Sequence, residues 1–139
     1  MLLKIADIKG TRVNKSKLLY EILRTIIRKR QRLDREKEHF FVVGLNYACN
    51  IIYIDLAALG STTAAVLDMR SVYRLAIEKG ITRMIVAHNH PSGNLQPSKS
   101  DDDLTRKIRE AGQILDVELV DHLIFTTENY YSYADHGKL

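Results

Sequence analysis

A buried strand that ends in two closely spaced histidines constrains this chain more than any other feature. Thr82–Ala87 is an almost unbroken apolar run, which is typical of a strand covered on both faces. Such a strand lies inside a sheet and needs a layer of structure on either side. His88–Pro97 follows with two prolines, one glycine and two asparagines, a loop composition. We therefore expect a polar loop at the carboxyl end of a central strand, where open α/β sheets place their binding crevices.

The rest of the chain predicts a mixed α/β domain around that strand. Apolar residues recur with a period near 3.6 where helices are expected, and aromatic or β-branched runs mark the strands. The predicted elements are a short strand or extended arm over 2–12, a helix that begins near Asn14 or Ser16, strands over 39–45, 51–54, 62–67 and 82–87, helices over 68–79 and from Ser98 to about Leu115 (inner face Leu104, Ile108, Ala111 and Leu115), and strands over 117–125 and 130–133.

Length and composition exclude several classes. The 139 residues are one domain's worth of chain, and 45% hydrophobic with 27% charged residues is ordinary globular usage, which argues against disorder and repeat arrays. We expect no membrane span, because no run of 18 apolar residues occurs, and a cytoplasmic protein, because no secretory signal is evident. A single cysteine, Cys49, excludes an internal disulfide and a CxxC zinc site.

The formal charge of +4 is unevenly distributed. Residues 1–37 hold 12 Lys/Arg and 4 Asp/Glu, whereas residues 38–139 hold 9 and 13. The basic segment reads as an N-terminal strand and helix extension packed on a single domain that spans 1–139. Its cations can form the solvated face of a core-packed helix, or they can make weak contact with nucleic acid.

The two histidines carry the chemistry. Side chains at i and i+2 of an extended chain point the same way, so His88 and His90 can both reach one metal ion. Imidazole nitrogen suits zinc, and a catalytic zinc takes three protein ligands plus water. Asp101, in the first turn of the following helix, is the natural third ligand. The alternative is a purely structural role, in which Ser98 and Asp101 form only a capping box and Asp101, Asp102 and Asp103 only complement the helix dipole. The two interpretations are compatible.

The composite pattern His-x-His-Pro, six residues, Ser98, two residues, Asp101 resembles the JAMM motif of JAB/MPN-domain metalloproteins. More narrowly, the run AHNHPSGNLQPSKSD is similar to that of the RadC family. Glu38 before HFFVV, Gly60 with a strand over 62–66, the DHLI run at 121–124, and Ser132 extend the resemblance over about residues 5–139. It implies a three-layer α/β sandwich with a mixed sheet, similar to the JAB/MPN and cytidine-deaminase-like architecture.

The resemblance also implies roles for individual residues. His88, His90 and Asp101 would ligate zinc, and Ser98 would help to stabilise the oxyanion of a tetrahedral intermediate. Glu38 would be the general base, passing a proton from water to the leaving amine. Glu36 is its rival in the same charged run. Asn89, Pro91 and Gly93 are expected to shape the loop, and His122 to be structural. His39, His136 and Cys49 belong to no constellation.

The implied function is a zinc-dependent metallohydrolase that cleaves a peptide or isopeptide bond in an unspecified peptide or protein substrate. The alternatives are a DNA-associated accessory protein with a non-catalytic metal site and a protein-interaction module on the same fold. RadC-like proteins often carry an N-terminal helix-hairpin-helix-like region, for which 139 residues are too few, so we do not expect a DNA-binding role of that region to transfer. The tripeptide His-Asn-His is not the spaced signature of HNH nucleases, and the PCxxC element of zinc deaminases is absent. Neither the substrate nor the oligomeric state can be read from the sequence.

Overall fold

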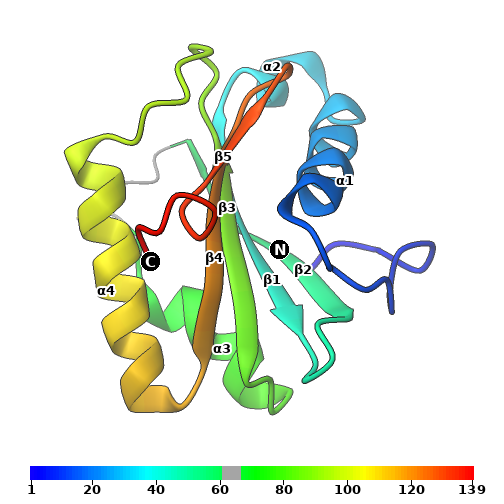
Figure 1. The fold of residues 1–139 in the computed structure, drawn as a ribbon. Coiled ribbons are helices and arrows are strands. Elements are labelled where there is room, and N and C mark those ends of the chain that lie inside the picture. The colour runs from blue at the N-terminus through cyan, green and yellow to red at the C-terminus, as the bar shows by residue number, and fades with distance from the viewer. Residues whose placement is uncertain (61–66) are drawn as a thin grey trace.

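The apolar strand lies at the centre of a five-stranded mixed sheet of order β2-β1-β3-β4-β5, in a computed structural model that describes residues 1–60 and 67–139 (Figure 1). The strands are β1 (Glu38–Leu45), β2 (Ile51–Gly60), β3 (Arg83–Asn89), β4 (Glu118–Phe125) and β5 (Tyr130–Ser132). The helices are α1 (Ser16–Arg28), α2 (Arg32–Arg35), α3 (Met69–Glu78) and α4 (Lys99–Leu115).

Strand pairing places the end of β3 between the start of β1 and the end of β4. β1 pairs antiparallel with β2 and β3, with Phe40 opposite His88. β3 and β4 are parallel, joined by the crossover through α4, and their register sets His88 opposite Ile124. β5 returns antiparallel to β4. Residues near 38, 88 and 124 therefore meet at one end of the sheet.

Helices cover both faces of the sheet, which confirms the predicted α/β sandwich. In Figure 1, α1 lies on one side and α3 and α4 lie on the other. Alternation along β1 sends Phe41 and Val43 into the core beneath α1, and Phe40 and Val42 into the core beneath α3 and α4. No helix within 1–60 and 67–139 is both long and apolar enough to cross a membrane.

Several predicted boundaries need correction. β3 continues through His88 and Asn89, because both are buried and pair with β4, so the loop begins at His90. β2 extends to Gly60, beyond the predicted end at residue 54, because it stays paired with β1 along its length. The predicted strand at 62–67 has residues 62–66 outside the described residues.

The helices differ from prediction at their ends. α1 begins at Ser16 with Lys15 as its N-cap and has no side-chain cap, so neither Asn14 nor Ser16 caps it. The charged run after it folds partly into the separate helix α2. Residues 2–12 form an extended arm with isolated bridges at Leu2 and Arg12, not a regular strand. Leu115, expected on the inner face of α4, is 42% exposed, since it is the last residue of that helix.

Candidate metal centre

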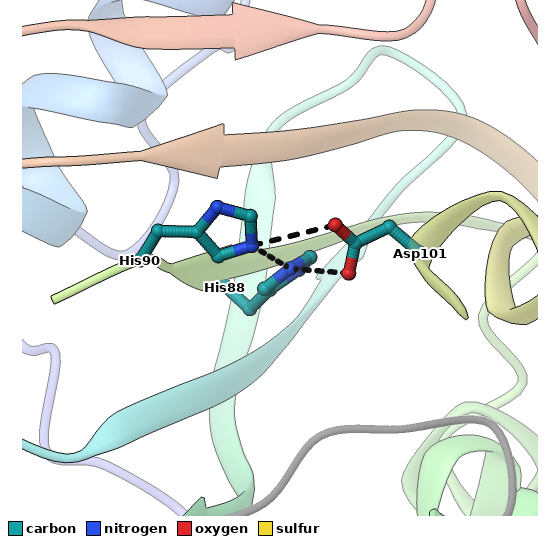
Figure 2. Close-up of side chains that lie close together, drawn as sticks. All are labelled: His88, His90 and Asp101. Atoms are coloured by element: carbon teal, nitrogen blue, oxygen red, sulfur yellow. Dashed lines mark hydrogen bonds and ion pairs between the residues drawn. The ribbon is translucent and has the colours of Figure 1, made fainter. Parts of the chain in front are cut away.

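Three predicted ligands meet at the end of β3 and the start of α4 (Figure 2). The Nε2 atoms of His88 and His90 lie 3.1 Å apart. His88 Nε2 lies 3.1 Å from Oδ1 of Asp101, and His90 Nε2 lies 3.4 Å from Oδ2 of the same carboxylate. His88 and Asp101 are buried and His90 is half-buried. The geometry confirms that the i, i+2 spacing and the first helical turn bring two imidazoles and one carboxylate together.

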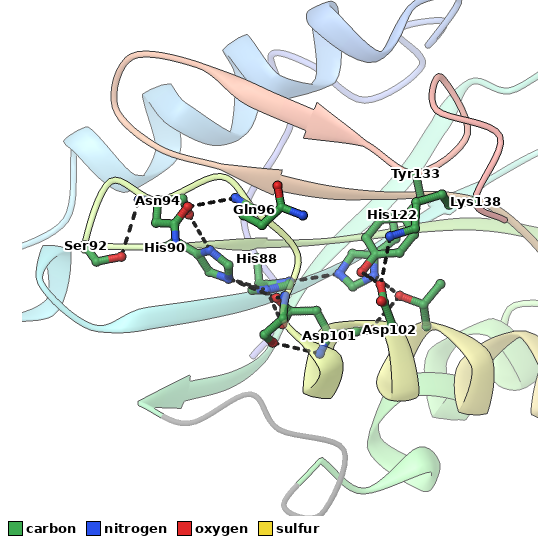
Figure 3. Close-up of polar contacts among 12 residues, drawn as sticks. His88, His90, Ser92, Asn94, Gln96, Asp101, Asp102, His122, Tyr133 and Lys138 are labelled. Atoms are coloured by element: carbon green, nitrogen blue, oxygen red, sulfur yellow. Dashed lines mark hydrogen bonds and ion pairs between the residues drawn. The ribbon is translucent and has the colours of Figure 1, made fainter.

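A chain of hydrogen bonds behind His88 fixes which nitrogen faces the site (Figure 3). Thr105 donates its hydroxyl hydrogen to the backbone oxygen of Asp101 at 2.8 Å, so it accepts from His122 Nδ1 at 2.6 Å. His122 Nε2 is then unprotonated and accepts from Nδ1 of His88 at 2.8 Å. In the neutral ring, this network leaves the lone pair of His88 on Nε2, the form that binds a metal, whereas in the charged ring an Nε2–H donates to Asp101 instead.

His122 stays neutral in this chain. Its side chain is fully buried, and burial, together with the nearby His88, holds its pKa well below the ordinary value. The ring stacks on Tyr133 with centroids 4.9 Å apart. The sequence interpretation of His122 as structural is therefore incomplete, because the ring orients His88 directly. His88 and His122 lie on neighbouring parallel strands, a relation that sequence spacing does not reveal.

His90 is oriented by the loop that follows it. Nδ1 donates to the backbone oxygen of Asn94 at 2.6 Å, so the lone pair of the neutral ring is on Nε2, which faces the site. The pKa of His90 is raised, chiefly by its hydrogen bond with Asp101, and Glu38 adds to the shift through its charge. A metal ion would compete with that proton, since a metal-bound imidazole must be neutral.

Ser98 and Asp101 form the capping box that the sequence suggested as a purely structural alternative to metal binding. Asp101 N donates to Ser98 Oγ at 3.0 Å, and Ser98 N donates to Asp101 Oδ2 at 2.8 Å. Burial raises the pKa of Asp101, but hydrogen bonds from His88, His90 and Ser98 outweigh burial and hold the pKa far below its usual range. Asp101 is thus both the N3 residue of α4 and an ionised member of the cluster, as expected from the compatible interpretations.

Glu38 lies close to the cluster through strand register. The pairing of β1 with β3 begins at Phe40, opposite His88, so Glu38 lies two residues before the first paired residue at that end of the sheet, and its charge acts on His90. The Asn89 side chain bonds the residues on either side of Glu38: its Oδ1 accepts from His39 N at 2.5 Å, and its Nδ2 donates to Lys37 O at 3.2 Å. Asn89 was expected to shape the loop, but it instead ties the start of β1 to the end of β3.

The other charged and nucleophilic candidates lie elsewhere. Glu36 is exposed and precedes β1, on the side of His90 that faces α1. His39 is buried, with its ring bonded to Lys37 O. Cys49 is in the β1–β2 turn at a positive φ of 65°. None of these residues belongs to the three-ligand group, which agrees with the sequence prediction for His39 and Cys49.

The donor set fits a metal ion. Two imidazole nitrogens and one carboxylate oxygen, all within 4.8 Å of one another, are three ligands of the kind that zinc accepts with one position left open. Comparison with known proteins places the chain in a family with this type of site: the model of the RadC-like JAB domain matches residues 13–138. The chain belongs to the RadC-like JAB domain family.

Curated relatives of this RadC-like JAB domain support the assignment. A UPF0758 protein of Flavobacterium johnsoniae is 38% identical over 130 residues, which are 94% of this chain and 55% of that protein. UPF0758 proteins of Chlorobium chlorochromatii and Chlorobaculum tepidum are each 36% identical over 106 residues, 76% of this chain and 48% of theirs. The chain thus spans about half the length of the curated relatives it matches.

Proposed function

We propose that this RadC-like JAB domain is a zinc-dependent hydrolase of the JAMM type that cleaves a peptide or isopeptide bond. The observation that carries the proposal is the three-ligand group of His88, His90 and Asp101, and it is supported by Glu38, whose charge acts on His90. A structural zinc site would be closed by a fourth protein ligand. Three ligands with a neighbouring carboxylate are instead the arrangement of catalytic zinc sites.

Each residue of the proposed active site has a separate role. His88, His90 and Asp101 would hold zinc, which when bound supplies a Lewis acid that polarises a carbonyl and acidifies water. Glu38 accepts a proton from the attacking water and delivers it to the leaving amine. Ser98 uses its oxygen as an acceptor within the cap, which leaves its O–H able to donate to a developing oxyanion. The substrate class follows from this chemistry, which suits an amide carbonyl.

Metal content is the first test. The native protein and His88→Ala are reloaded with zinc and assayed side by side. We expect one zinc per chain in the native protein and loss of stoichiometric zinc in the variant, because removing one of three ligands leaves too few donors. A native protein without stoichiometric zinc would contradict the proposal.

Hydrolysis is the second test, with Glu38→Gln compared with Glu110→Gln on a quenched-fluorescent peptide library. We expect Glu38→Gln to lower kcat by about 100-fold or more at unchanged zinc affinity, because the amide cannot accept a proton. Glu110→Gln, an equal charge change on the exposed surface of α4, should retain activity. Equal loss in both variants would argue against Glu38 as the base.

The alternative function, a DNA-associated accessory protein, rests on the basic residues of the first 37 positions. Its test is the salt dependence of duplex binding. A steep dependence that flattens when Arg28, Lys29 and Arg30 are neutralised would favour it, provided that the hydrolysis assay gives no Glu38-dependent signal.

A further inference from the structure

A cavity of about 310 Å³ lies on the α1 side of His90, next to the candidate metal centre. It is bounded by α1, α2, the start of the loop after β3 and the turn after β4, which gather at one end of the sheet (Figure 1). His90 and Asn89 form part of its wall, so the cavity and the metal ligands share a boundary. A substrate bound across His90 would place a neighbouring group in this cavity.

Three guanidinium groups line the cavity, those of Arg24, Arg28 and Arg35. Arg24 is half-buried and positioned by Nη1 contacts to Tyr20 Oη at 3.4 Å and Thr127 O at 3.3 Å. Its Nε is buried and has no hydrogen-bond partner among the described residues. Buried donors ordinarily have a partner, so an acceptor inside the cavity would complete this one.

The cavity keeps a positive charge because its cations are not neutralised by the protein. Arg28 and Arg35 are exposed, and neither takes part in an ion pair among the described residues, whereas Arg30 nearby is paired with Asp34 at 3.5 Å. Among the described residues, Glu36 is the one carboxylate in the lining. Three guanidinium groups and one carboxylate give the lining a net charge of +2 when His90 is neutral, which favours the binding of an anion.

We propose that this cavity, the arginine subsite, binds a carboxylate of the peptide substrate beside the bond that is cleaved. The inference rests on the proposed hydrolase function and adds a substrate preference to it. Guanidinium groups match a carboxylate in shape and can bond it through two parallel N–H groups. Such a carboxylate comes from an acidic side chain or from a free C-terminus of the peptide.

A peptide carboxylate fits the arginine subsite better than a nucleic acid does. The unpaired arginines surround a small cavity and do not form an extended basic stripe along the surface. Arg30, which could have extended them, is paired with Asp34 and is not part of the lining. Its aromatic lining residue, Phe125, is 1% exposed, so it offers no face for base stacking.

The experiment is a binding titration of the full, zinc-loaded chain, followed by the side-chain Nε–H resonances of arginine and the amide resonances of Thr126 and Thr127. The probes are acetyl-Gly-Glu-Gly-amide, for an internal acid, and acetyl-Gly-Gly with a free C-terminus. Each is matched by its uncharged counterpart, with Gln in place of Glu or with a C-terminal amide. Hexathymidylate is the nucleic-acid probe. Arg28→Gln, Arg35→Gln and Glu36→Gln are compared with Arg32→Gln, an equal charge change on the exposed surface of α2 that lies outside the cavity lining.

We expect at least one acidic probe to bind about tenfold more tightly than its uncharged counterpart, since a hydrogen bond to a charged group is worth more than a neutral one. Arg28→Gln and Arg35→Gln should weaken that binding by about tenfold each, Glu36→Gln should tighten it, and Arg32→Gln should change it less than about twofold. Which acidic probe binds identifies the source of the carboxylate.

Three outcomes would overturn the inference: equal binding of charged and uncharged peptides, an Arg32→Gln effect as large as that of Arg28→Gln, or tighter binding of hexathymidylate than of the acidic peptides. The titration needs no turnover. A protein that binds the acidic probe but cleaves nothing would therefore refute the proposed hydrolysis alone, whereas one that cleaves peptides without charge preference would refute the subsite alone.

Discussion

At the scale of single residues, the side chains behind the ligands decide how well the ligands are presented. His88 faces the site with an unprotonated Nε2 because His122 and Thr105 direct the hydrogen bonds behind it. Partners of this kind orient metal-binding imidazoles and raise their basicity. Affinity for zinc should therefore depend on residues that never touch it.

Thr105→Val tests this dependence. The valine keeps the shape but removes the acceptor for His122 Nδ1, so we expect zinc affinity to fall about tenfold. Thr25→Val is the matched control, because Thr25 makes the same kind of bond to a backbone oxygen four residues earlier, that of Glu21, on exposed α1. Competition with a chromophoric chelator measures both. Equal affinities in the two variants would remove the positioning role from Thr105.

Asn89→Ala tests the tie between β1 and β3. The variant loses both bonds that flank Glu38, so the carboxylate should lose its fixed place while the three ligands remain. We expect kcat on a cleaved peptide to fall about tenfold or more with little change in zinc affinity, because misplacing a catalytic group is costly. A parallel loss of zinc would show instead that the change disrupts the whole loop.

These residues also mark the limit of sequence reasoning. His88, His90 and Asp101 could be predicted because spacing along one strand and one helical turn is local. His122, Thr105 and Asn89 could not, because their roles depend on strand register and on the pairing of β3 with β4. The signal that could have found His122 was its place in the DHLI strand, parallel to a strand that ends in ligands.

At the scale of elements, the start of α4 does two jobs. The capping box begins the helix and, through the same hydrogen bonds, sets the carboxylate of Asp101 toward the histidines. The sequence predicted both the cap and the nearness of Asp101 to the two histidines. It misplaced the ends of β2 and β3, because strand length depends on which neighbours remain available for pairing.

Ser98→Ala separates the two jobs when it is compared with Asp68→Ala, which removes the side-chain cap of α3. Each variant should lose about 1 kcal/mol of stability, the usual worth of an N-cap. Ser98→Ala should in addition weaken zinc binding, since Asp101 is no longer held by its backbone N–H. Urea unfolding and zinc titration measure the two effects. If both variants kept native zinc affinity, the cap would have no part in presenting Asp101.

At the scale of the whole molecule, buried histidines link folding to pH in the metal-free protein. Burial lowers the pKa of His122 strongly and lowers that of His39 as well, so folding favours the neutral forms of both. Their contribution to stability is complete above the unfolded pKa of about 6.5 and is lost as the pH falls toward the folded value. The raised pKa of His90 acts in the opposite direction.

We expect His122 to make the free energy of unfolding, in the presence of a chelator, fall by up to about 1.4 kcal/mol per pH unit on acidification below about pH 6. His122→Asn, which keeps a polar group but cannot titrate, should make the slope shallower by about one proton, whatever its effect on stability at neutral pH. Urea midpoints across the pH range measure the slope. An unchanged slope in the variant would mean that His122 does not contribute to it.

The parallel pairing of β3 and β4 has a further consequence, for the order in which contacts form during folding. His88 meets His122 only after the chain has crossed over through α4, and Asn89 bonds the residues that flank Glu38 only after β1 has paired with β3. Contacts between residues so far apart in sequence carry a loop-closure cost and form slowly. The contacts that orient the donors are therefore completed late, so metal added during refolding should be captured after the sheet has formed and should slow unfolding more than it speeds folding.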